Sequence, residues 1–220
     1  MPTMSAAIRA AQCPLALTGA GVSAPSGIPT FQTLWKGQPI RDFLGRDYYR
    51  RDPVGFFELY CAMEAWCSAE PNAAHRVLAN LKIPILTQNI DNLHQKAGSA
   101  NVIELHGNLR RLLCPSCGHM YNAKNLCATL RPLYAVGDEA AIRRCLTCAC
   151  GSMVDVDVVL YGDAVRGLDR SIALLEKCDL LVVIGTSLQT YPAAMLPDIA
   201  ARHGARIMVE DTDCIAALAE

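Results

Sequence analysis

Asp179-Leu180-Leu181-Val182-Val183-Ile184, followed by Gly185-Thr186-Ser187, is the clearest strand signal in this chain of 220 residues. Because the apolar run is strand-sized and has no alternating polar residues, we expect a strand buried on both faces. Further short apolar runs are found at residues 14–18, 83–87, 101–105 and 206–209. Helices are expected between the strands, over residues 53–65, 73–81, 91–97, 168–176 and 191–203. This alternation predicts an α/β fold, a doubly wound parallel Rossmann-like sheet covered by helices on both faces.

Composition and charge exclude several classes of protein. Hydrophobic residues make up 52% of the chain, which is enough for a packed core. With 20 Lys and Arg residues against 21 Asp and Glu residues, the formal net charge is -1, so we expect no nucleic-acid partner. No apolar stretch has the length of a membrane span, and residues 1–13 lack the pattern of a secretory signal. We therefore expect a cytoplasmic protein with no membrane partner.

The cysteines are concentrated in one part of the chain. Of the 11 cysteines, two close groups stand out, Cys114 with Cys117, and Cys145 with Cys148 and Cys150. In a reducing compartment such groups indicate a metal site, whereas unrelated buried cysteines are the alternative. Four thiolates bind zinc tetrahedrally and close its coordination sphere, so the ion would stabilise the fold without acting in catalysis. We expect Cys114, Cys117, Cys148 and Cys150 to be the ligands, with Cys145 as a possible substitute.

The zinc ligands define an insertion in the α/β domain. We expect residues 111–153 to form a small zinc-binding module, and residues 1–110 and 154–220 to form the Rossmann-like domain. The helical part of the small domain should also include residues from the segment 33–70.

Unusual polar and glycine-rich segments follow four of the predicted strands. These segments are Gly19 to Gln32, Gln88 to Asp91, His106-Gly107 and Gly185 to Ser187. In a parallel sheet the carboxyl ends of the strands meet at one edge, and ligands bind beyond that edge. We therefore expect one ligand cleft where the four segments converge.

The first of these segments, Gly19-Ala20-Gly21-Val22-Ser23-Ala24, fits the Gly-x-Gly-x-x-Gly/Ala nucleotide-binding pattern. Glycines there allow a tight turn and let backbone N–H groups approach a pyrophosphate, although a plain turn has the same pattern. In a dehydrogenase the pattern continues into a helix, whereas Pro25, Gly27 and Pro29 interrupt one here. We expect a long loop, and hydride transfer is disfavoured.

Candidate catalytic side chains occupy two other strand exits. Asn89 and Asp91 follow the second strand, where Asp91 is also a plausible helix N-cap. His94 lies on the next helix and is expected to be a hydrogen-bonded packing residue. His106 follows the third strand. Most isolated histidines are structural, but the position of His106 at the ligand edge and the pKa range of imidazole suit a general base.

Taken together, the motifs resemble those of the sirtuins, the family of NAD-dependent protein deacylases. The resemblance runs in order over nearly the whole chain. It rests on residues 19–24 with 26–31, 87–94, 106–107, 150–151 with 158–163, and 185–188 with 192–194. It implies NAD as cosubstrate, one structural Zn²⁺, and an acyl-lysine protein or peptide as substrate.

The resemblance also implies a mechanism and a set of site residues. The acyl oxygen would attack the nicotinamide ribose and release nicotinamide; His106 would then act as general base on a ribose hydroxyl, and Asn89 would orient the ribose. The products would be free lysine and O-acyl-ADP-ribose. NAD contacts are expected from Gly19, Ala20, Gly21, Ile28, Thr30, Phe31, Gln32, Gln88, Asn89, Asp91, Gly185, Thr186, Ser187 and Glu210. The peptide is expected to add as a strand along Val159, Leu160, Tyr161, Gly162 and Leu188.

Some positions depart from the family pattern. Gln32 stands where the family usually has Arg, which would weaken cofactor positioning, and Met208 stands near the usual position of an Asn that recognises the adenosine ribose. Members that prefer acidic acyl chains carry Tyr-x-x-Arg on a helix beside the acyl channel. The aligned residues here are Tyr60-Cys61-Ala62-Met63. We therefore expect Tyr60 and Met63 beside a neutral acyl chain, since a buried carboxylate would lack a partner.

Other functions stay open on the sequence alone. ADP-ribosyl transfer to protein and plain NAD hydrolysis use the same activated ribose, and Gln32 leaves room for both. A module of another class would sense NAD or ADP-ribose without turnover, although a sensor needs no general base. We expect a monomer.

Overall fold

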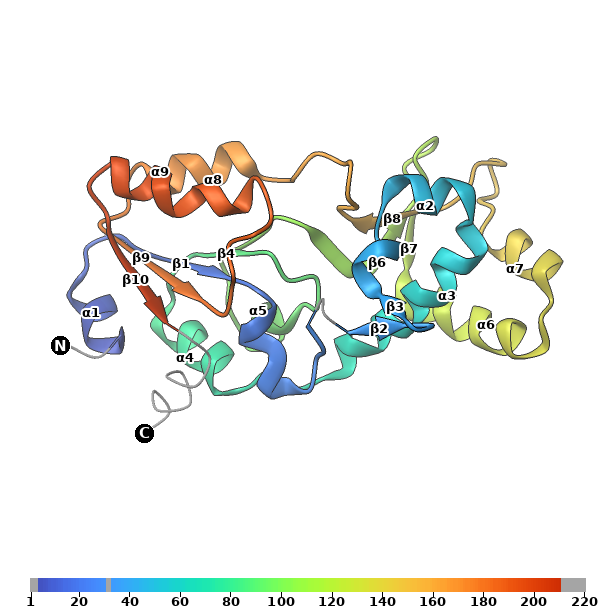
Figure 1. Cartoon of the computed structure of the whole chain (residues 1–220), viewed down its shortest axis with the longest axis horizontal. Helices are drawn as coiled ribbons and strands as arrows, with labels where there is room; N and C mark the ends of the chain where they lie inside the picture. Colours follow the sequence, from blue (N-terminus) through green and yellow to red (C-terminus); the bar gives the residue numbers. More distant parts are fainter. Residues whose placement is uncertain (1–3, 31–32, 211–220) are drawn as a thin grey trace.

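Two lobes make up the part of the chain that the structure describes, residues 4–30 and 33–210 of a computed structural model. Figure 1 shows a lobe with a parallel sheet on the left and a smaller lobe on the right, joined by more than one pass of the chain. Among the described residues, no helix combines the length and the apolar character needed to cross a membrane.

The larger lobe is built on a parallel sheet with the strand order β10-β9-β1-β4-β5. The strands are β1 Pro14–Thr18, β4 Ile85–Thr87, β5 Val102–Glu104, β9 Leu180–Ile184 and β10 Arg206–Glu210. In the register, Leu17 of β1 is aligned with Leu86 of β4 and with Val183 of β9. The predicted Rossmann-like sheet is confirmed, and the ends of its strands lie at one edge.

Helices cover both faces of this sheet, because successive side chains of each strand point to opposite faces. On one face α1 Met4–Ala10 and α4 Ala73–Leu81 pack against a buried cluster that includes Ala16 and Val182. On the other face α8 Leu168–Leu175 and α9 Leu196–Arg202 pack against a cluster that includes Leu17. Figure 1 shows α8 and α9 above the sheet and α1 and α4 below it.

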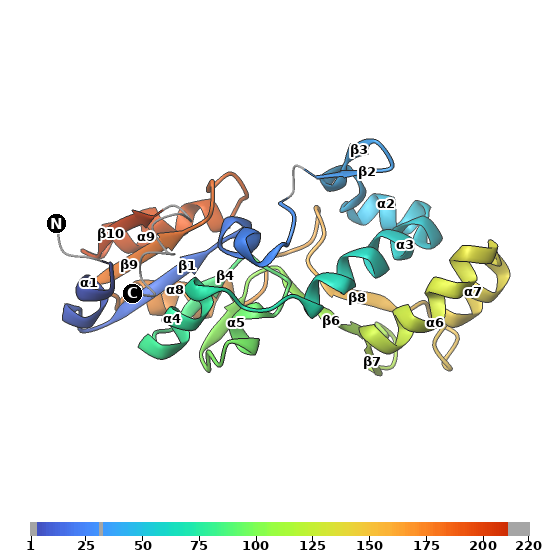
Figure 2. The ribbon, with the colours of Figure 1, turned by 90° about the horizontal axis from the view of Figure 1, so that it is seen from below.

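The smaller lobe contains an antiparallel sheet with the order β7-β6-β8. Its strands and helices are β6 Gly107–Leu113, β7 Met120–Asn122, β8 Asp155–Val158, α2 Arg46–Arg51, α3 Pro53–Glu64, α6 Ala123–Val136 and α7 Glu139–Cys145. Phe56, Phe57 and Tyr60 of α3 are fully buried in the core of this lobe. Figure 2 shows α6 and α7 at the end of the molecule farthest from the parallel sheet.

Short elements complete the described chain. They are β2 Leu34–Trp35, β3 Gln38–Pro39, α5 Leu93–Lys96, and the 3-10 helices η1 Ala20–Ser26, η2 Ile40–Phe43, η3 Ala65–Ser68 and η4 Ala193–Met195. As the prolines predicted, the first glycine motif does not continue into an α-helix: the 3-10 helix η1 ends at Ser26 and is capped by Gly27, whose φ is 82°.

Several boundaries differ from the sequence prediction. The small sheet runs from Gly107 to Val158, beyond the expected module 111–153, because these two residues pair with each other. The helix expected over 191–203 begins only at Leu196, which places Pro197 in its first turn, where the missing N–H costs little. The helix expected from Asp91 begins at Leu93, so Asn92 and not Asp91 has the N-cap position, but the Asp91 carboxylate accepts from the Leu93 N–H at 2.9 Å.

Gly107 lies where the chain first crosses from the large sheet to the small one. Its φ is +77°, and a Cβ there would overlap the carbonyl oxygen of Asp157. Around it, the Val159 N–H donates to the His106 carbonyl at 2.8 Å and the Arg166 N–H donates to the Leu105 carbonyl at 3.0 Å. The crossover therefore admits only glycine at this position.

We predict that Gly107→Ala destabilises the protein far more than Gly137→Ala. Gly137 has a similar φ of +70° but nothing within 4 Å of its would-be Cβ, so its substitution adds left-handed strain alone. That strain costs about 1 kcal/mol, and the added clash should bring Gly107→Ala to about 3 kcal/mol or more, a loss of roughly 6–12 °C in Tm. Thermal denaturation of both variants measures this. Equal losses would show that the crossover relaxes freely.

Candidate active site

A cavity of about 520 Å³ lies between the strand ends of the large sheet and the edge of the small lobe. Its lining includes these predicted residues: Gly19, Ala20, Gly21, Thr30, Gln88, His106, Val159, Leu160, Tyr161, Gly162, Gly185, Thr186 and Ser187. The volume lies in the range of small-molecule and cofactor sites. The four strand exits therefore converge on one cleft, as the sequence predicted.

The glycines of two exits allow their loops to touch. The Gly21 N–H donates to the Gly185 carbonyl at 2.8 Å, and the Gly19 N–H donates to the Ile184 carbonyl at 3.1 Å. A Cβ on Gly21 would lie 2.8 Å from the Gly185 oxygen, and Gly185 itself has a φ of +61°. The sequence pattern was interpreted as a way to bring backbone close to a pyrophosphate. In the structure these glycines first serve to pack one loop against the other.

His106 faces the cavity with a defined tautomer. Its Nδ1 lies 3.0 Å from the carbonyl oxygen of Gln88. A carbonyl can only accept, so Nδ1 carries the proton and Nε2 of the neutral ring keeps a free lone pair. Burial lowers the pKa of His106 from 6.5, although the bond to the Gln88 carbonyl opposes the shift. At neutral pH the ring is therefore an uncharged base.

Asn89 and Asp91 lie behind the cavity wall and are joined through Ser23. The Asn89 amide donates to Ser23 Oγ at 3.0 Å, and Ser23 Oγ donates to the Asp91 carboxylate at 2.7 Å. Asn89 is 7% exposed and Asp91 4%, and neither is among the residues that line the cavity. Burial raises the pKa of Asp91, whereas the hydrogen bonds that its carboxylate accepts from the Leu93 N–H and from Ser23 Oγ lower it by a smaller amount. The amide oxygen of Asn89 has no hydrogen bond within the described chain.

The sequence analysis assigned no role to Ser23. It belongs to the quoted glycine motif, and a hydroxyl among glycines at a strand exit was the only signal for it. Its position, fully buried in the middle of the 3-10 helix η1, lets one hydroxyl bond to both Asn89 and Asp91. A hydroxyl in this motif suggests a polar contact but does not identify its partners, because Asn89 and Asp91 come from the second strand exit.

His94 has the packing role that the sequence predicted. It is 1% exposed, its Nε2 lies 2.9 Å from Thr18 Oγ1, and its ring is 4.8 Å from that of His75. Burial lowers the pKa of His75 to about 4 and that of His94 to about 3, so both rings are neutral at pH 7. Neither histidine lines the cavity.

The expectation that Tyr60 and Met63 contact an acyl chain is wrong. Both are fully buried in the core of the small lobe and absent from the cavity lining. The Tyr60 hydroxyl donates to the Leu109 carbonyl at 2.9 Å, which directs it toward β6. Tyr60 and Met63 lie on the face of α3 that packs into the core of the small lobe, where Met63 contributes to packing.

Other predicted site residues lie near the cleft without lining it. Ile28 and Leu188 are packed beside it, and the Glu210 carbonyl accepts from the Gly185 N–H at 3.5 Å. Phe31 and Gln32 lie outside the described residues. Conversely, the lining includes residues that the sequence analysis did not single out: Arg41, Leu44, Ile90, Val158, Asp163, Val165, Gln189, Thr190 and Tyr191.

The predicted substrate edge is a turn and not a strand. β8 ends at Val158, and the Tyr161 backbone is already used: its N–H donates to the Leu44 carbonyl at 2.9 Å, and its carbonyl accepts from the Arg46 N–H at 3.0 Å. The Val159 carbonyl and the backbone of Gly162 make no hydrogen bond among the described residues. Those groups are free to pair with another chain.

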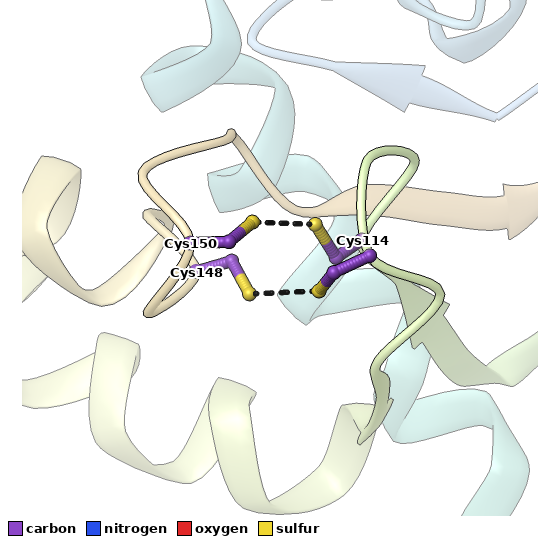
Figure 3. A group of neighbouring side chains, drawn as sticks. Cys114, Cys148 and Cys150 are labelled. Carbon is purple, nitrogen blue, oxygen red and sulfur yellow. Dashed lines mark hydrogen bonds between the residues drawn. The ribbon is translucent and has the colours of Figure 1, made fainter.

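The predicted metal ligands come together in the small lobe. The Sγ atoms of Cys114, Cys117, Cys148 and Cys150 all lie within 4.8 Å of one another. Figure 3 shows Cys148 and Cys150 on one loop facing Cys114 on the other. A tetrahedral zinc with Zn–S bonds of about 2.3 Å needs sulfurs ~3.8 Å apart, so the cluster fits zinc. Cys145 is not part of the cluster, so it is not the substitute ligand.

Comparison with known proteins places this geometry in a family. The Sir2 family model matches residues 19–192. The chain belongs to the Sir2 family.

Relatives of known name cover most of the chain. An NAD-dependent protein deacetylase of Bacillus subtilis is 39% identical over 211 residues, 90% of this chain and 83% of that protein. An NAD-dependent protein deacylase of Thermococcus kodakarensis is 37% identical over 205 residues, 88% of this chain and 77% of that protein.

Solved structures agree with the sequence comparison. A Sir2 homolog–NAD complex superimposes with a TM-score of 0.83 at 32% identity and covers 96% of this chain and 88% of that one. Sir2Tm bound to a propionylated peptide gives a TM-score of 0.78 at 32% identity, over 92% of this chain and 82% of that one. The predicted resemblance to the sirtuins and the predicted fold are thereby confirmed.

We predict that Cys148→Ser abolishes zinc binding, whereas Cys145→Ser retains one zinc per chain. Cys148 belongs to the sulfur cluster and Cys145 does not. Loss of a closed structural site should lower Tm by on the order of 5–10 °C, and a strong chelator should do the same to the unsubstituted protein. Metal analysis and thermal denaturation measure both effects. Zinc loss from Cys145→Ser would mean that the ligand set has been assigned incorrectly.

Proposed function

We propose that this member of the Sir2 family is an NAD-dependent protein-lysine deacylase in which His106 is the general base. The observation that carries the proposal is the neutral imidazole of His106, with its free Nε2, on a cavity formed by the strand exits. NAD supplies the activated ribose carbon, which the acyl oxygen of the substrate lysine attacks as nicotinamide leaves. The products are nicotinamide, free lysine and O-acyl-ADP-ribose.

The role of His106 follows from its hydrogen bond. With Nδ1–H held by the Gln88 carbonyl, the ring presents Nε2 to a ribose hydroxyl and accepts its proton. The same carbonyl stabilises the imidazolium that results. Asn89, whose amide nitrogen is held by Ser23, would turn its free oxygen toward the ribose or a water.

Backbone N–H groups would bind the phosphates of NAD. Those of Gly19 and Gly21 are occupied by the contacting loop, whereas those of Ala20, Thr186 and Ser187 have no partner among the described residues. The N–H groups at the start of a helix suit an anion. The proposal thus shifts phosphate binding from the glycines themselves to their neighbours.

The peptide would lie between the lobes and pair with the Val159 carbonyl and the Gly162 backbone. An added strand recognises mainly main-chain groups, so sequence selectivity would be loose. The cavity lining includes the apolar residues Ile90, Val158 and Leu160. On the basis of these apolar lining residues we propose neutral acyl groups as preferred substrates. The contact with Met63, on which the sequence prediction rested, does not exist.

We further propose that the enzyme acts as a cytoplasmic monomer and binds no nucleic acid. The near-zero net charge of -1 supports the absence of a nucleic-acid partner.

We predict that the purified protein converts an acetyl-lysine peptide to free lysine peptide only with NAD, and that His106→Tyr lowers turnover by about 10²–10⁴-fold. His203→Gln, on an exposed histidine outside the cavity, should leave turnover unchanged. A succinyl-lysine peptide should react more slowly than the acetyl peptide. Mass analysis of all products decides: ADP-ribosylated protein or free ADP-ribose without O-acetyl-ADP-ribose would replace the proposal with transfer or hydrolysis, and binding of NAD without turnover would make the protein a sensor.

We predict that kcat/KM stays on its plateau as the pH falls through 6.5 and declines only at lower pH. Burial lowers the pKa of His106, so the neutral base persists at pH values where a solvated histidine is half protonated. The measurement is kcat/KM for the acetyl peptide across the pH range, after a check that activity returns when each sample is brought back to neutral pH. An apparent pKa of 6.5 or above for the acid limb would contradict this assignment of the base.

A further inference from the structure

Arg46 holds both ends of the segment that forms the substrate edge. Its Nε and Nη2 bind the two carboxylate oxygens of Asp163 at 2.9 and 2.7 Å, and its Nη1 binds Asp155 at 2.8 Å. Asp155 begins β8, which leads into the edge, and Asp163 ends the turn, so one guanidinium joins the start of the strand to the end of the edge. The Arg46 side chain is 17% exposed, and the two aspartates are 23% exposed.

The backbone of Arg46 contacts the same segment. Its N–H donates to the Tyr161 carbonyl at 3.0 Å, and residue Gly45 forms a parallel bridge with Tyr161. On the other side of the turn, the Leu160 N–H donates to the Asp163 carboxylate at 3.0 Å. Side chain and main chain of one residue therefore determine the path of the turn from both sides.

The guanidinium is itself held in place. It stacks on the ring of Tyr49 at 5.1 Å, and the Tyr49 hydroxyl donates to the Val154 carbonyl at 2.9 Å. A planar, two-pronged bond to a carboxylate is geometrically strict, and the stacked ring removes the remaining freedom of the guanidinium. Lysine could supply the charge but not this geometry.

The contacts leave open the main-chain groups that a peptide would use. Tyr161 and the Leu160 N–H are bonded within the clamp, whereas the Val159 carbonyl and the Gly162 backbone are not bonded within the described chain. Strand addition gains affinity when the receiving edge is already ordered, because less freedom is lost on binding.

We propose that Arg46 is a positioning residue for the acyl-lysine peptide: it orders the turn from Val159 to Asp163 as a ready-made edge for strand addition. The inference rests on the proposed deacylase function for its substrate. Arg46 does not line the cleft that holds the strand exits, so it acts through the turn and not on NAD. Loss of the clamp disorders the peptide edge and leaves the glycine loops untouched.

The test measures binding of a fluorescently labelled acetyl-lysine peptide without NAD, together with the KM for NAD. Arg46→Gln should weaken peptide binding on the order of tenfold and change the KM for NAD less than twofold. Arg46→Lys should fall between Arg46→Gln and the unsubstituted protein. The matched control is Arg131→Gln, which removes another arginine–carboxylate pair of the small lobe, between Arg131 and Glu64 at 2.8 Å, without touching the turn.

Equal weakening of peptide binding by Arg131→Gln would overturn the proposal, since any loss of small-lobe stability would then suffice. Unchanged peptide binding in Arg46→Gln would overturn it directly. If Arg46→Gln fails to fold, Arg46→Lys and Asp163→Asn replace it, and unchanged peptide affinity in both has the same meaning. Because peptide binding is read without turnover, a protein that binds the peptide but releases no product would refute the deacylase function and still test the clamp.

Discussion

The contact between Gly107 and the Asp157 carbonyl determines where the two lobes meet. At this point the chain leaves the parallel sheet, and the backbone on both sides is bonded to the returning strand and its connection. His106 immediately precedes the contact, so its ring is placed by the same crossover. A side chain at residue 107 would push the small lobe away from the strand exits and open the cleft that the lobes share.

Burial shifts the pKa values of several titratable groups in and around the wall of the cleft. His75, His94 and His106 have lowered pKa values, and Asp91 has a raised one, each chiefly because burial disfavours the charged form. The exception is the clamp of Arg46, where opposite charges compensate each other. Of the three histidines and Asp91, only His106 lines the cavity, where it presents an uncharged base to a dinucleotide.

The sequence was most informative where one residue type has few uses. Continuous apolar runs predicted the parallel strands, and the spacing of Cys114, Cys117, Cys148 and Cys150 predicted the metal cluster. It misplaced Tyr60 because residues three apart on a helix share a face, and the pattern does not say whether that face is turned to the cleft or to the core. It gave Ser23 no role because its partners come from a different strand exit.

The sequence by itself determined the succession of strands and helices along the chain, the two cysteine groups that supply the metal ligands and the edge of the sheet where chemistry occurs. These follow from local periodicity and from the rule that parallel strands end on one side. Only the tertiary structure decided which polar side chains reach the cavity, which hydrogen bond selects the tautomer of His106, and that Arg46 joins Asp155 to Asp163. These contacts link residues 18 to 117 positions apart in the chain, and their distances depend on how separate segments pack, which no local pattern encodes.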